Sequence, residues 1–342
     1  MIRQNFNADW TVEKGDGNSR MNSFLGNTQT KTVHLPYDAM IHEARTPDTK
    51  NGAQTGFYPG GEYIFQKHFT APQAWQGKPV SLVFEGVYQT ALVYLNGWLL
   101  TRNVNGYAEF TVEAGPYLKY GADNLLKVIA DNSLEPNSRW YTGSGIYRPV
   151  RLLVGNKVYL PQDTVRITTR EADEGFALLD VTAQVQSAST VTERVTLQQT
   201  ICREGTAVLT DRQNLLLQPG ESRTVSFRYC VDSPALWSPE NPNLYTSTMQ
   251  VLEGEEELDR EETGFGIRTL SIDAAHGVRI NGQTVKLRGA CIHHDNGILG
   301  AATLPDAEER RIRQLKEAGF NAIRSSHHPA GRALLDACDR YG

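Results

Sequence analysis

Four histidines and one arginine near the carboxyl terminus are the residues of this sequence best suited to chemistry. His293 and His294 form one pair, and His327 and His328 form a second pair just after Arg324. Imidazole rings and a guanidinium group hydrogen-bond to hydroxyl groups, and the guanidinium also attracts carboxylates. The set therefore predicts a site for a polar ligand or for a carboxylate that approaches from elsewhere.

Other roles are open to the same residues. Arg324 could form an internal ion pair, and His328 could only cap a helix. Because neighbouring residues of a strand face opposite ways, one member of the pair His293 and His294 suffices for a functional role. The histidines together with Asp295 could also bind zinc. Adjacent histidines chelate poorly compared with alternating or one-turn spacing, so we predict neither a metal nor a cofactor.

The elements around these residues read as strand, helix, strand, helix. "VRINGQTVKL" predicts a hairpin over an Asn-Gly turn, whose second arm continues through "RGACIHH". "PDAEERRIRQLKEAGF" predicts a helix with Asp306 as its N-cap and Gly319 as its stop. "NAIRSS" predicts a second strand, and a second helix is expected to start at His328-Pro329. This order is typical of parallel βα units.

Functional groups of βα barrels lie at the carboxyl ends of the strands. His293 follows the first predicted barrel strand, and Arg324 and His327 lie at the end of the second, so we expect one shared mouth. A closed (β/α)8 barrel needs at least about 200 residues, and residues 271–342 supply only its first βα units. We therefore expect the chain to be the amino-terminal fragment of a longer protein.

The sequence before the barrel predicts two β-sandwiches. In residues 1–156, strand patterns such as "GEYIFQKHFT", "VSLVFEGV" and "NLLKVIADN" follow at short spacing, and "ALVYLNGWLL" holds an Asn-Gly hairpin turn. This favours a jelly-roll sandwich. In residues 157–270, the runs "TVRITT", "ALLDVTAQVQ", "RVTLQQTIC", "TVSFRYCV" and "LYTSTMQVL" have the spacing of an immunoglobulin-like sandwich. The predicted fold class is thus mainly β, with the start of a (β/α)8 barrel.

Composition excludes several partners. The 342 residues carry 34 Lys and Arg against 39 Asp and Glu, a net charge of −5 without a basic run, so no nucleic acid is expected. There is no apolar segment that could cross a membrane, and the first residues do not form a signal peptide. We expect a cytoplasmic protein. Its four cysteines, too sparse for a disulfide scaffold, are predicted to be buried free thiols: Cys202, Cys230, Cys291 and Cys338.

Three stretches resemble one known family. "NAIRSSHHPAGRALLDACDRYG" resembles the signature of glycoside hydrolase family 2, and "LRGACIHHDNGILGAA" resembles the first barrel strand and loop of its β-galactosidase-like members. "RWYTGSGIYRPVRL" is similar to the stretch that closes the family's sugar-binding sandwich. The resemblance covers essentially the whole chain. His328 departs from it, because the family most often has tyrosine or asparagine there, which bears on substrate preference.

The resemblance implies roles for individual residues. His293 and His327 would hold sugar hydroxyls, and Arg324 would keep a distant nucleophile ionised. Asn137, in the loop "PNSRW", would reach the sugar from the first domain, whereas Trp140 of that loop is expected to fill the core. A retaining glycosidase needs two carboxyl groups about 5–5.5 Å apart. By resemblance both lie on later barrel strands, so no residue up to Gly342 is expected to be catalytic.

The function predicted from this resemblance is that of the amino-terminal part of a retaining β-galactosidase acting on a carbohydrate substrate. β-Glucuronidase and β-mannosidase of the same family remain alternatives. A homo-oligomer is open as well. Two alternatives come from other classes. A noncatalytic carbohydrate-binding protein would fit a gene that ends at Gly342, and a metal-dependent hydrolase would contain bound zinc.

Overall fold

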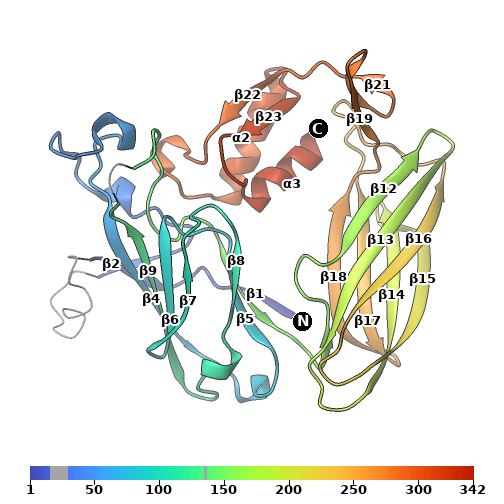
Figure 1. Cartoon of the computed structure of the whole chain (residues 1–342), viewed down its shortest axis with the longest axis horizontal. Helices are drawn as coiled ribbons and strands as arrows, with labels where there is room; N and C mark the ends of the chain where they lie inside the picture. Colours follow the sequence, from blue (N-terminus) through green and yellow to red (C-terminus); the bar gives the residue numbers. More distant parts are fainter. Residues whose placement is uncertain (16–29, 135–136) are drawn as a thin grey trace.

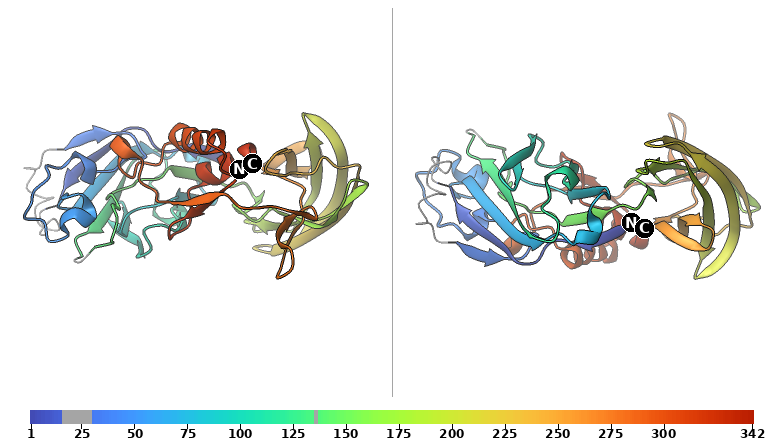
Figure 2. Two further views of the ribbon diagram at one scale, coloured as in Figure 1. Left: turned by 90° about the horizontal axis from the view of Figure 1, so that it is seen from above. Right: turned by 90° about the horizontal axis from the view of Figure 1, so that it is seen from below.

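The computed structural model describes residues 1–15, 30–134 and 137–342. Two β-sandwiches lie at the two ends of an elongated molecule, and a small βα part lies between them, against the first sandwich (Figures 1 and 2). The mainly β fold class predicted from the sequence is thereby confirmed, including the start of a barrel.

The first sandwich packs a six-stranded sheet on a four-stranded sheet, and both are antiparallel. Its core contains large side chains that are almost fully buried, such as Trp10, Phe65, Phe84 and Leu126. The six-stranded sheet has the order β3 (Lys31–Val33), β2 (Trp10–Lys14), β4 (Gly61–Thr70), β9 (Asp123–Asn132), β6 (Thr90–Leu95) and β7 (Trp98–Asn103). The four-stranded sheet has the order β1 (Ile2–Asn5), β10 (Val150–Val154), β5 (Val80–Phe84) and β8 (Phe110–Glu113).

The predicted hairpin turn joins β6 to β7. Asn96 and Gly97 both have positive φ, 52° and 89°, as the tight turn between two twisted strands requires.

The second sandwich has a separate core from Val158 to Ile267. Its central strand β13 alternates strictly between buried and half-buried residues, as its sequence predicts. β15 and β18, which are edge strands, do not show this pattern, because most side chains of β15 are in water and β18 is rich in exposed or half-exposed glutamate. One sheet contains β11 (Val158–Tyr159), β12 (Arg166–Ala172), β13 (Phe176–Ser187) and β16 (Ser222–Asp232), and the other β14 (Glu193–Arg203), β15 (Thr206–Leu217), β17 (Tyr245–Glu253) and β18 (Glu256–Phe265).

The last part begins with a three-stranded antiparallel sheet and continues with two βα units. β22 and β23 form the only parallel pair of strands among the described residues. α2 and α3 pack together through Ile312, Leu334 and Ala337. The elements are β19 (Leu270–Asp273), β20 (Gly277–Ile280), β21 (Gln283–Thr284), β22 (Gly289–Ile292), α2 (Pro305–Glu317), β23 (Ala322–Ser325) and α3 (Arg332–Tyr341).

Three boundary predictions in this part are wrong. The hairpin arm does not continue into the barrel strand, because β21 ends at Thr284 and the chain leaves its partner before β22. α2 starts at Pro305, a residue suited to the first helical position, so Asp306 lies in the first turn instead of capping it. α3 starts at Arg332 after Gly331, not at His328, and the chain between is a loop.

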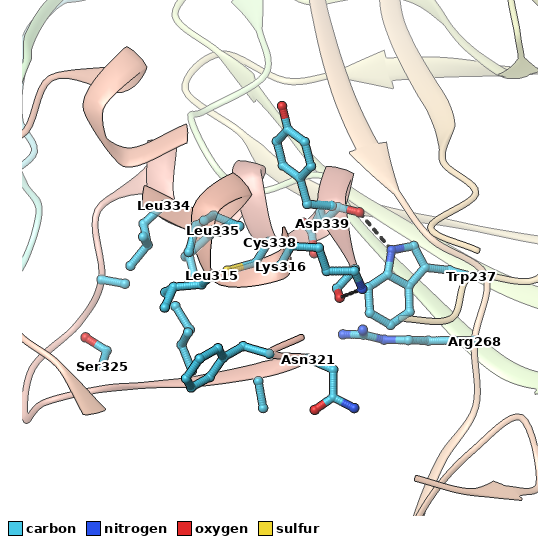
Figure 3. A pocket seen from close by; sticks show the side chains of 17 residues that line it. Trp237, Arg268, Leu315, Lys316, Asn321, Ser325, Leu334, Leu335, Cys338 and Asp339 are labelled. Carbon is cyan, nitrogen blue, oxygen red and sulfur yellow. Dashed lines mark hydrogen bonds between the residues drawn. The ribbon is translucent and has the colours of Figure 1, made fainter. Parts of the chain in front are cut away.

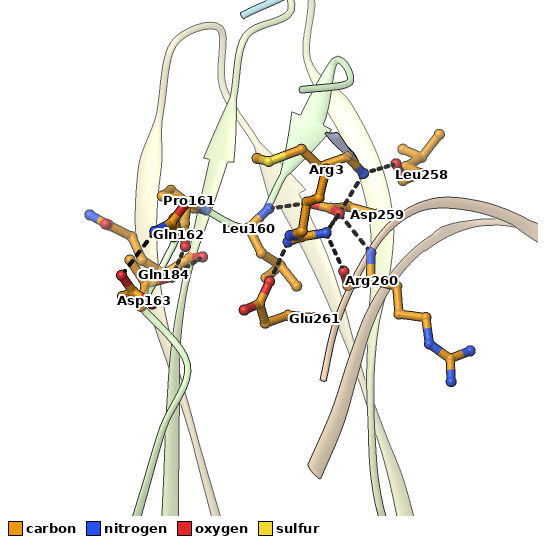
Figure 4. A network of polar contacts seen from close by, with 12 residues as sticks. Arg3, Leu160, Pro161, Gln162, Asp163, Gln184, Leu258, Asp259, Arg260 and Glu261 are labelled. Carbon is orange, nitrogen blue, oxygen red and sulfur yellow. Dashed lines mark hydrogen bonds and ion pairs between the residues drawn. The ribbon is translucent and has the colours of Figure 1, made fainter. Parts of the chain in front are cut away.

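Charged side chains join the three parts. Arg332 of α3 donates to both carboxylate oxygens of Glu109 in the first sandwich, each at 2.8 Å, and pairs with Asp163 at the start of the second. The two sandwiches are also joined directly. Arg3 of β1 lies 3.3 Å from Asp259 and pairs with Glu261, both on β18 (Figure 4). The βα part is therefore fixed to both sandwiches.

The four cysteines are free, as predicted. The prediction that they are buried is wrong for Cys230 and Cys291, whose side chains point out of their strands into water, whereas Cys202 and Cys338 are half-buried. In the described part of the chain, no helix is long and apolar enough to cross a membrane.

Candidate functional site

The carboxyl ends of β22 and β23 lie side by side and carry the predicted site residues. The two strands pair with Cys291 opposite Arg324 and Ile292 opposite Ser325. Ile292 packs against the helices, so the alternation of the strands places Cys291 and Arg324 on the other, exposed face. One Arg324 Nη donates to Cys291 Sγ at 3.6 Å. Among the described residues, no carboxylate forms an ion pair with Arg324.

His293 and His327 lie close together just beyond these strand ends. Their ring centroids are 5.9 Å apart, and Trp140 of the first sandwich packs against both, at 5.0 Å from His293 and 5.6 Å from His327. Trp140 also donates from Nε1 to the hydroxyl of Tyr107 at 3.3 Å. The expectation that Trp140 fills the core is wrong, because its half-exposed ring instead forms a wall beside the two histidines.

Asn137 lies in the same loop as Trp140 but makes other contacts. Its side-chain nitrogen donates to Asn132 Oδ1 at 2.9 Å, and its side-chain oxygen accepts from the backbone N–H of Ser138 at 2.7 Å. No hydrogen bond or ring contact among the described residues links Asn137 to His293, Arg324 or His327. Pro136, the first residue of the quoted loop, lies outside the described residues.

His294 is buried, whereas its neighbour His293 is half-exposed beside Trp140; β22 ends at Ile292, so strand alternation does not extend to this pair. His294 is 6% exposed, and its Nε2–H donates to the carbonyl of Thr142 at 2.8 Å. The rings of Tyr107 and Tyr147 lie 5.2 and 5.3 Å from it. Burial lowers the pKa of His294 to about 3, so the ring is neutral and holds the barrel part against the first sandwich.

His328 does not cap a helix. Its ring stacks on Tyr107 with centroids 4.4 Å apart and planes 10° from parallel. Burial also lowers the pKa of His328. The side chain therefore belongs to the contact between the two parts of the molecule.

Asp38 holds the loops that carry these rings, a role that the sequence analysis missed. Its carboxylate is 1% exposed and accepts from the hydroxyl of Tyr141 at 2.6 Å and from the backbone N–H groups of Ser144 at 3.0 Å and Ala301 at 2.8 Å. Gly143 passes so close that a Cβ there would lie 2.5 Å from that of Ala301. In the sequence Asp38 is a single aspartate in "LPYDAM", and no motif or spacing indicates a contact with residue 301.

Two further observations bear on other kinds of site. No group of three or more histidine, cysteine, aspartate or glutamate side chains within the described residues could hold a metal ion. A cavity of about 480 Å³ lies between α2, α3 and the second sandwich, where Trp237 donates to the carbonyl of Asp339 at 2.8 Å (Figure 3). Its mostly apolar lining comes from α2, α3 and β23 together with Trp237 and Arg268, and it does not include His293, Arg324 or His327, so it suits packing better than chemistry.

The groups at the strand ends are suited to binding a polar ligand. Imidazoles, an indole ring and a guanidinium offer hydrogen-bond donors and acceptors, a flat apolar surface and a positive charge. These are the groups that hold a polar ring compound with hydroxyl groups.

Family models match nearly the whole chain in succession. A model described as glycosyl hydrolase 2 galactose-binding domain-like matches residues 10–176, and one described as glycosyl hydrolases family 2 matches residues 158–268. A third, glycosyl hydrolases family 2, TIM barrel domain, matches residues 274–342.

Individual relatives are similar over the same length. A β-galactosidase of Bacteroides ovatus, BoGH2A, is 37% identical over 99% of the chain, which spans 40% of that protein. A putative β-glucuronidase of Formosa agariphila is 31% identical over the whole chain, which spans 32% of it. A solved structure of a glycosyl hydrolase family 2 member from Bacteroides cellulosilyticus matches the whole chain with a TM-score of 0.94 at 35% identity, and the chain covers 45% of it.

Proposed function

The chain belongs to glycosyl hydrolase family 2, and from this premise we propose that it forms the amino-terminal part of a retaining exo-β-glycosidase that hydrolyses terminal β-galactosides. The observation that carries the proposal is the cluster of His293, His327 and Trp140 at the carboxyl ends of two parallel strands. The relative BoGH2A, named a β-galactosidase, supports this substrate. β-Glucuronidase is the second candidate, because the relative in Formosa agariphila has that name.

The proposed roles follow from the positions of the side chains. His293 and His327 hydrogen-bond to sugar hydroxyls, and Trp140 presents its ring to the apolar face of the sugar. Arg324 lies on the exposed face of its strand with no carboxylate partner among the described residues, so it is available to keep an approaching nucleophilic carboxylate ionised. A substrate contact by Asn137 remains a proposal that requires its side chain to leave Asn132.

The two catalytic carboxyl groups are proposed to come from barrel strands that these 342 residues do not include. A retaining mechanism needs an acid/base and a nucleophile about 5–5.5 Å apart. Support comes from the two parallel strands of the βα part, since a closed barrel has eight. Domains at 1–156, 157–270 and 271–342, a cytoplasmic location and a homo-oligomeric state complete the proposal.

The test starts from the genomic sequence after codon 342. We expect a continued reading frame with two glutamates on later barrel strands, and hydrolysis of nitrophenyl β-galactoside by its full product at a higher kcat/KM than of the β-glucuronide or β-mannoside. A preference for the β-glucuronide would mean that the substrate is a β-glucuronide instead of a β-galactoside. A stop codon after Gly342 would favour a noncatalytic carbohydrate-binding protein.

The roles of single residues are tested in the same full product. Arg324→Ala is expected to lower kcat more than it raises KM, because an ionised nucleophile matters most in the transition state. His327→Ala is expected to cost about 1.5–3 kcal/mol in kcat/KM if it removes a charge-assisted hydrogen bond. Unchanged kinetics in either variant would contradict the role given to that residue.

A further inference from the structure

A small, partly enclosed cavity lies where the first sandwich meets the βα part. Its volume is about 10 Å³, and its lining includes Arg148 of the first sandwich together with His293, His294 and His328. A space of about 10–15 Å³ holds one water molecule. The cavity lies behind the candidate sugar site and shares only His293 with it.

Four lining residues each present a polar atom that has no hydrogen-bond partner among the described residues. These atoms are buried, and leaving one unsatisfied costs about 1–3 kcal/mol. Arg148 is 3% exposed and His294 is 6% exposed. The atoms are Arg148 Nε, His293 Nδ1, His294 Nδ1 and His328 Nε2.

The hydrogen bonds on the other side of each ring determine which atoms are donors. His294 Nε2 lies 2.8 Å from the carbonyl of Thr142, and His328 Nδ1 lies 3.2 Å from that of Pro329. A carbonyl only accepts, so these two nitrogens carry the protons. In neutral rings the remaining nitrogens, His294 Nδ1 and His328 Nε2, are acceptors. Burial favours the neutral form, because it lowers the pKa of both rings.

Arg148 supplies a donor to the same place. Its terminal nitrogens donate to the carbonyls of Tyr107 at 2.8 Å and Pro329 at 2.9 Å, which fixes the guanidinium between the two parts. The Nε–H group, which is always protonated, remains for the cavity.

We propose that this cavity binds one water molecule, which donates to His294 Nδ1 and His328 Nε2 and accepts from Arg148 Nε–H. The ligand must both donate and accept. Arg311 and Glu308 also line the cavity and lie 3.7 Å apart, so their charges offset each other. A cation would meet the positive guanidinium of Arg148, and an anion would meet two nitrogen lone pairs. Water satisfies all three atoms and has one acceptor position left.

The fourth hydrogen bond goes to His293. Its Nδ1 is the remaining unsatisfied atom, and only a protonated Nδ1 can donate to the free lone pair of the water. The Nε2 atom of His293 is then an acceptor, so His293 would accept a hydrogen bond from a sugar hydroxyl. This last step rests on the proposed function, whereas the water site does not.

A crystal structure of the 342-residue chain at a resolution that shows ordered waters tests the site. We expect one density peak at about 2.7–3.2 Å from at least three of the four atoms. A well-ordered structure without such a peak would overturn the proposal. An anomalous peak at that position after a bromide soak would also overturn it, because the ligand would then be an anion.

A variant pair tests the acceptor of His328. His328→Phe keeps an aromatic ring against Tyr107 but removes the acceptor, and we expect the density peak to be lost. His327→Phe changes a neighbouring histidine that does not line the cavity, and we expect the peak to remain. A peak that persists in His328→Phe would contradict the proposal. Should that variant not fold, the structure of the unaltered chain decides alone.

Nitrogen NMR of histidine-labelled chain tests the proton positions in solution. We expect protons on Nε2 of His294, Nδ1 of His328 and Nδ1 of His293. A proton on Nε2 of His293 would overturn the fourth hydrogen bond. Neither the crystal nor the NMR experiment depends on glycosidase activity, so a failure of the proposed function leaves both results interpretable.

Discussion

At the scale of single residues, Asp38 and His294 show how buried polar groups join segments that are far apart in the sequence. Asp38 bonds to Ala301, 263 positions away, and His294 bonds to Thr142, 152 positions away. Each bond crosses the contact between the first sandwich and the βα part. Changes at these two residues should therefore affect how firmly the parts are joined.

The stability of the chain should depend on pH through His294. Its folded pKa of about 3 is below the ordinary value of 6.5, so below pH 6.5 the unfolded state binds a proton that the folded state does not. The contribution of the neutral His294 ring to the free energy of unfolding is fully present above pH 6.5. It is lost as the pH falls toward 3, at about 1.4 kcal/mol per pH unit. After burial, the nearby positive charge of Arg148 also lowers the pKa of His294. The other titratable groups that face His294 are His293, His328 and the tyrosines 88, 107 and 147.

Urea unfolding at pH 7.5 and pH 5 checks this prediction. The free energy of unfolding should fall by about 2 kcal/mol more in the unaltered chain than in His294→Phe, which keeps an aromatic ring but cannot bind a proton. His327→Phe, a change at an exposed ring, serves as control and should keep the pH dependence. The same pH dependence in His294→Phe would show that other groups cause it.

Asp38→Asn should destabilise the chain. Asparagine has only one side-chain oxygen, and its amide nitrogen cannot accept. The donors that now bond to the replaced carboxylate oxygen would therefore lose their acceptor. The cost should be about 2–3 kcal/mol in the free energy of unfolding. Asp48→Asn, at an exposed position in the same domain, is the matched control and should change the stability by less than about 0.5 kcal/mol. Equal stability of the two variants would argue against the role of Asp38.

At the scale of elements, α3 is joined to the rest of the molecule through its first residue. Arg332 contacts Glu109 in the first sandwich, 223 positions away, and Asp163 at the start of the second. The last residues of α3 contact the second sandwich through the bond between Trp237 and the Asp339 carbonyl. The helix thus bridges two domains that do not share a core.

Arg332→Gln should loosen α3 and the two parallel strands without unfolding the sandwiches. The ion pairs of Arg332 are partly exposed, so we expect the free energy of local opening to fall by about 1 kcal/mol. Amide exchange from residue 288 onward should then be about fivefold faster. Arg340→Gln, at the other end of α3, breaks a pair with Glu309 inside the same unit and should leave exchange in β22 unchanged. Hydrogen exchange followed by mass spectrometry gives the comparison, and equal rates in the two variants would contradict it.

At the scale of the whole molecule, two sandwiches with complete cores support a βα part that has only two strands. The sandwiches hold the strand ends and add Trp140 to the site, but the described residues bring no pair of carboxylates beside His293 and His327.

The purified 342-residue chain should therefore hydrolyse no nitrophenyl glycoside. Retaining hydrolysis needs one carboxyl group to protonate the leaving oxygen and another to attack, and the absence of either one stops the reaction. The assay uses chain checked for intact mass, with the full product as the positive control. Measurable turnover by the chain would require a carboxylate pair within residues 1–342.

The sequence by itself determined the order of the parts and much of their local structure. Short runs rich in apolar residues marked β4, β9 and β13, and Asn96-Gly97 marked a hairpin, because strand propensity and turn conformation depend on near neighbours. The order of strand and helix also placed His293 and His327 at one edge. The edge strands β15 and β18 were not predicted, because they are stabilised by pairing with a neighbouring strand and their composition is not typical of a strand.

Only the tertiary structure decided which side chains meet across the domains. The sequence left open whether Trp140 filled a core or faced the histidines, whether His328 capped a helix, and whether Arg324 was paired. It gave no sign that Asp38 and Arg148 reach the barrel part. These contacts join residues more than 100 positions apart, and such pairs leave no periodic pattern in the sequence because they depend on how complete domains pack against one another.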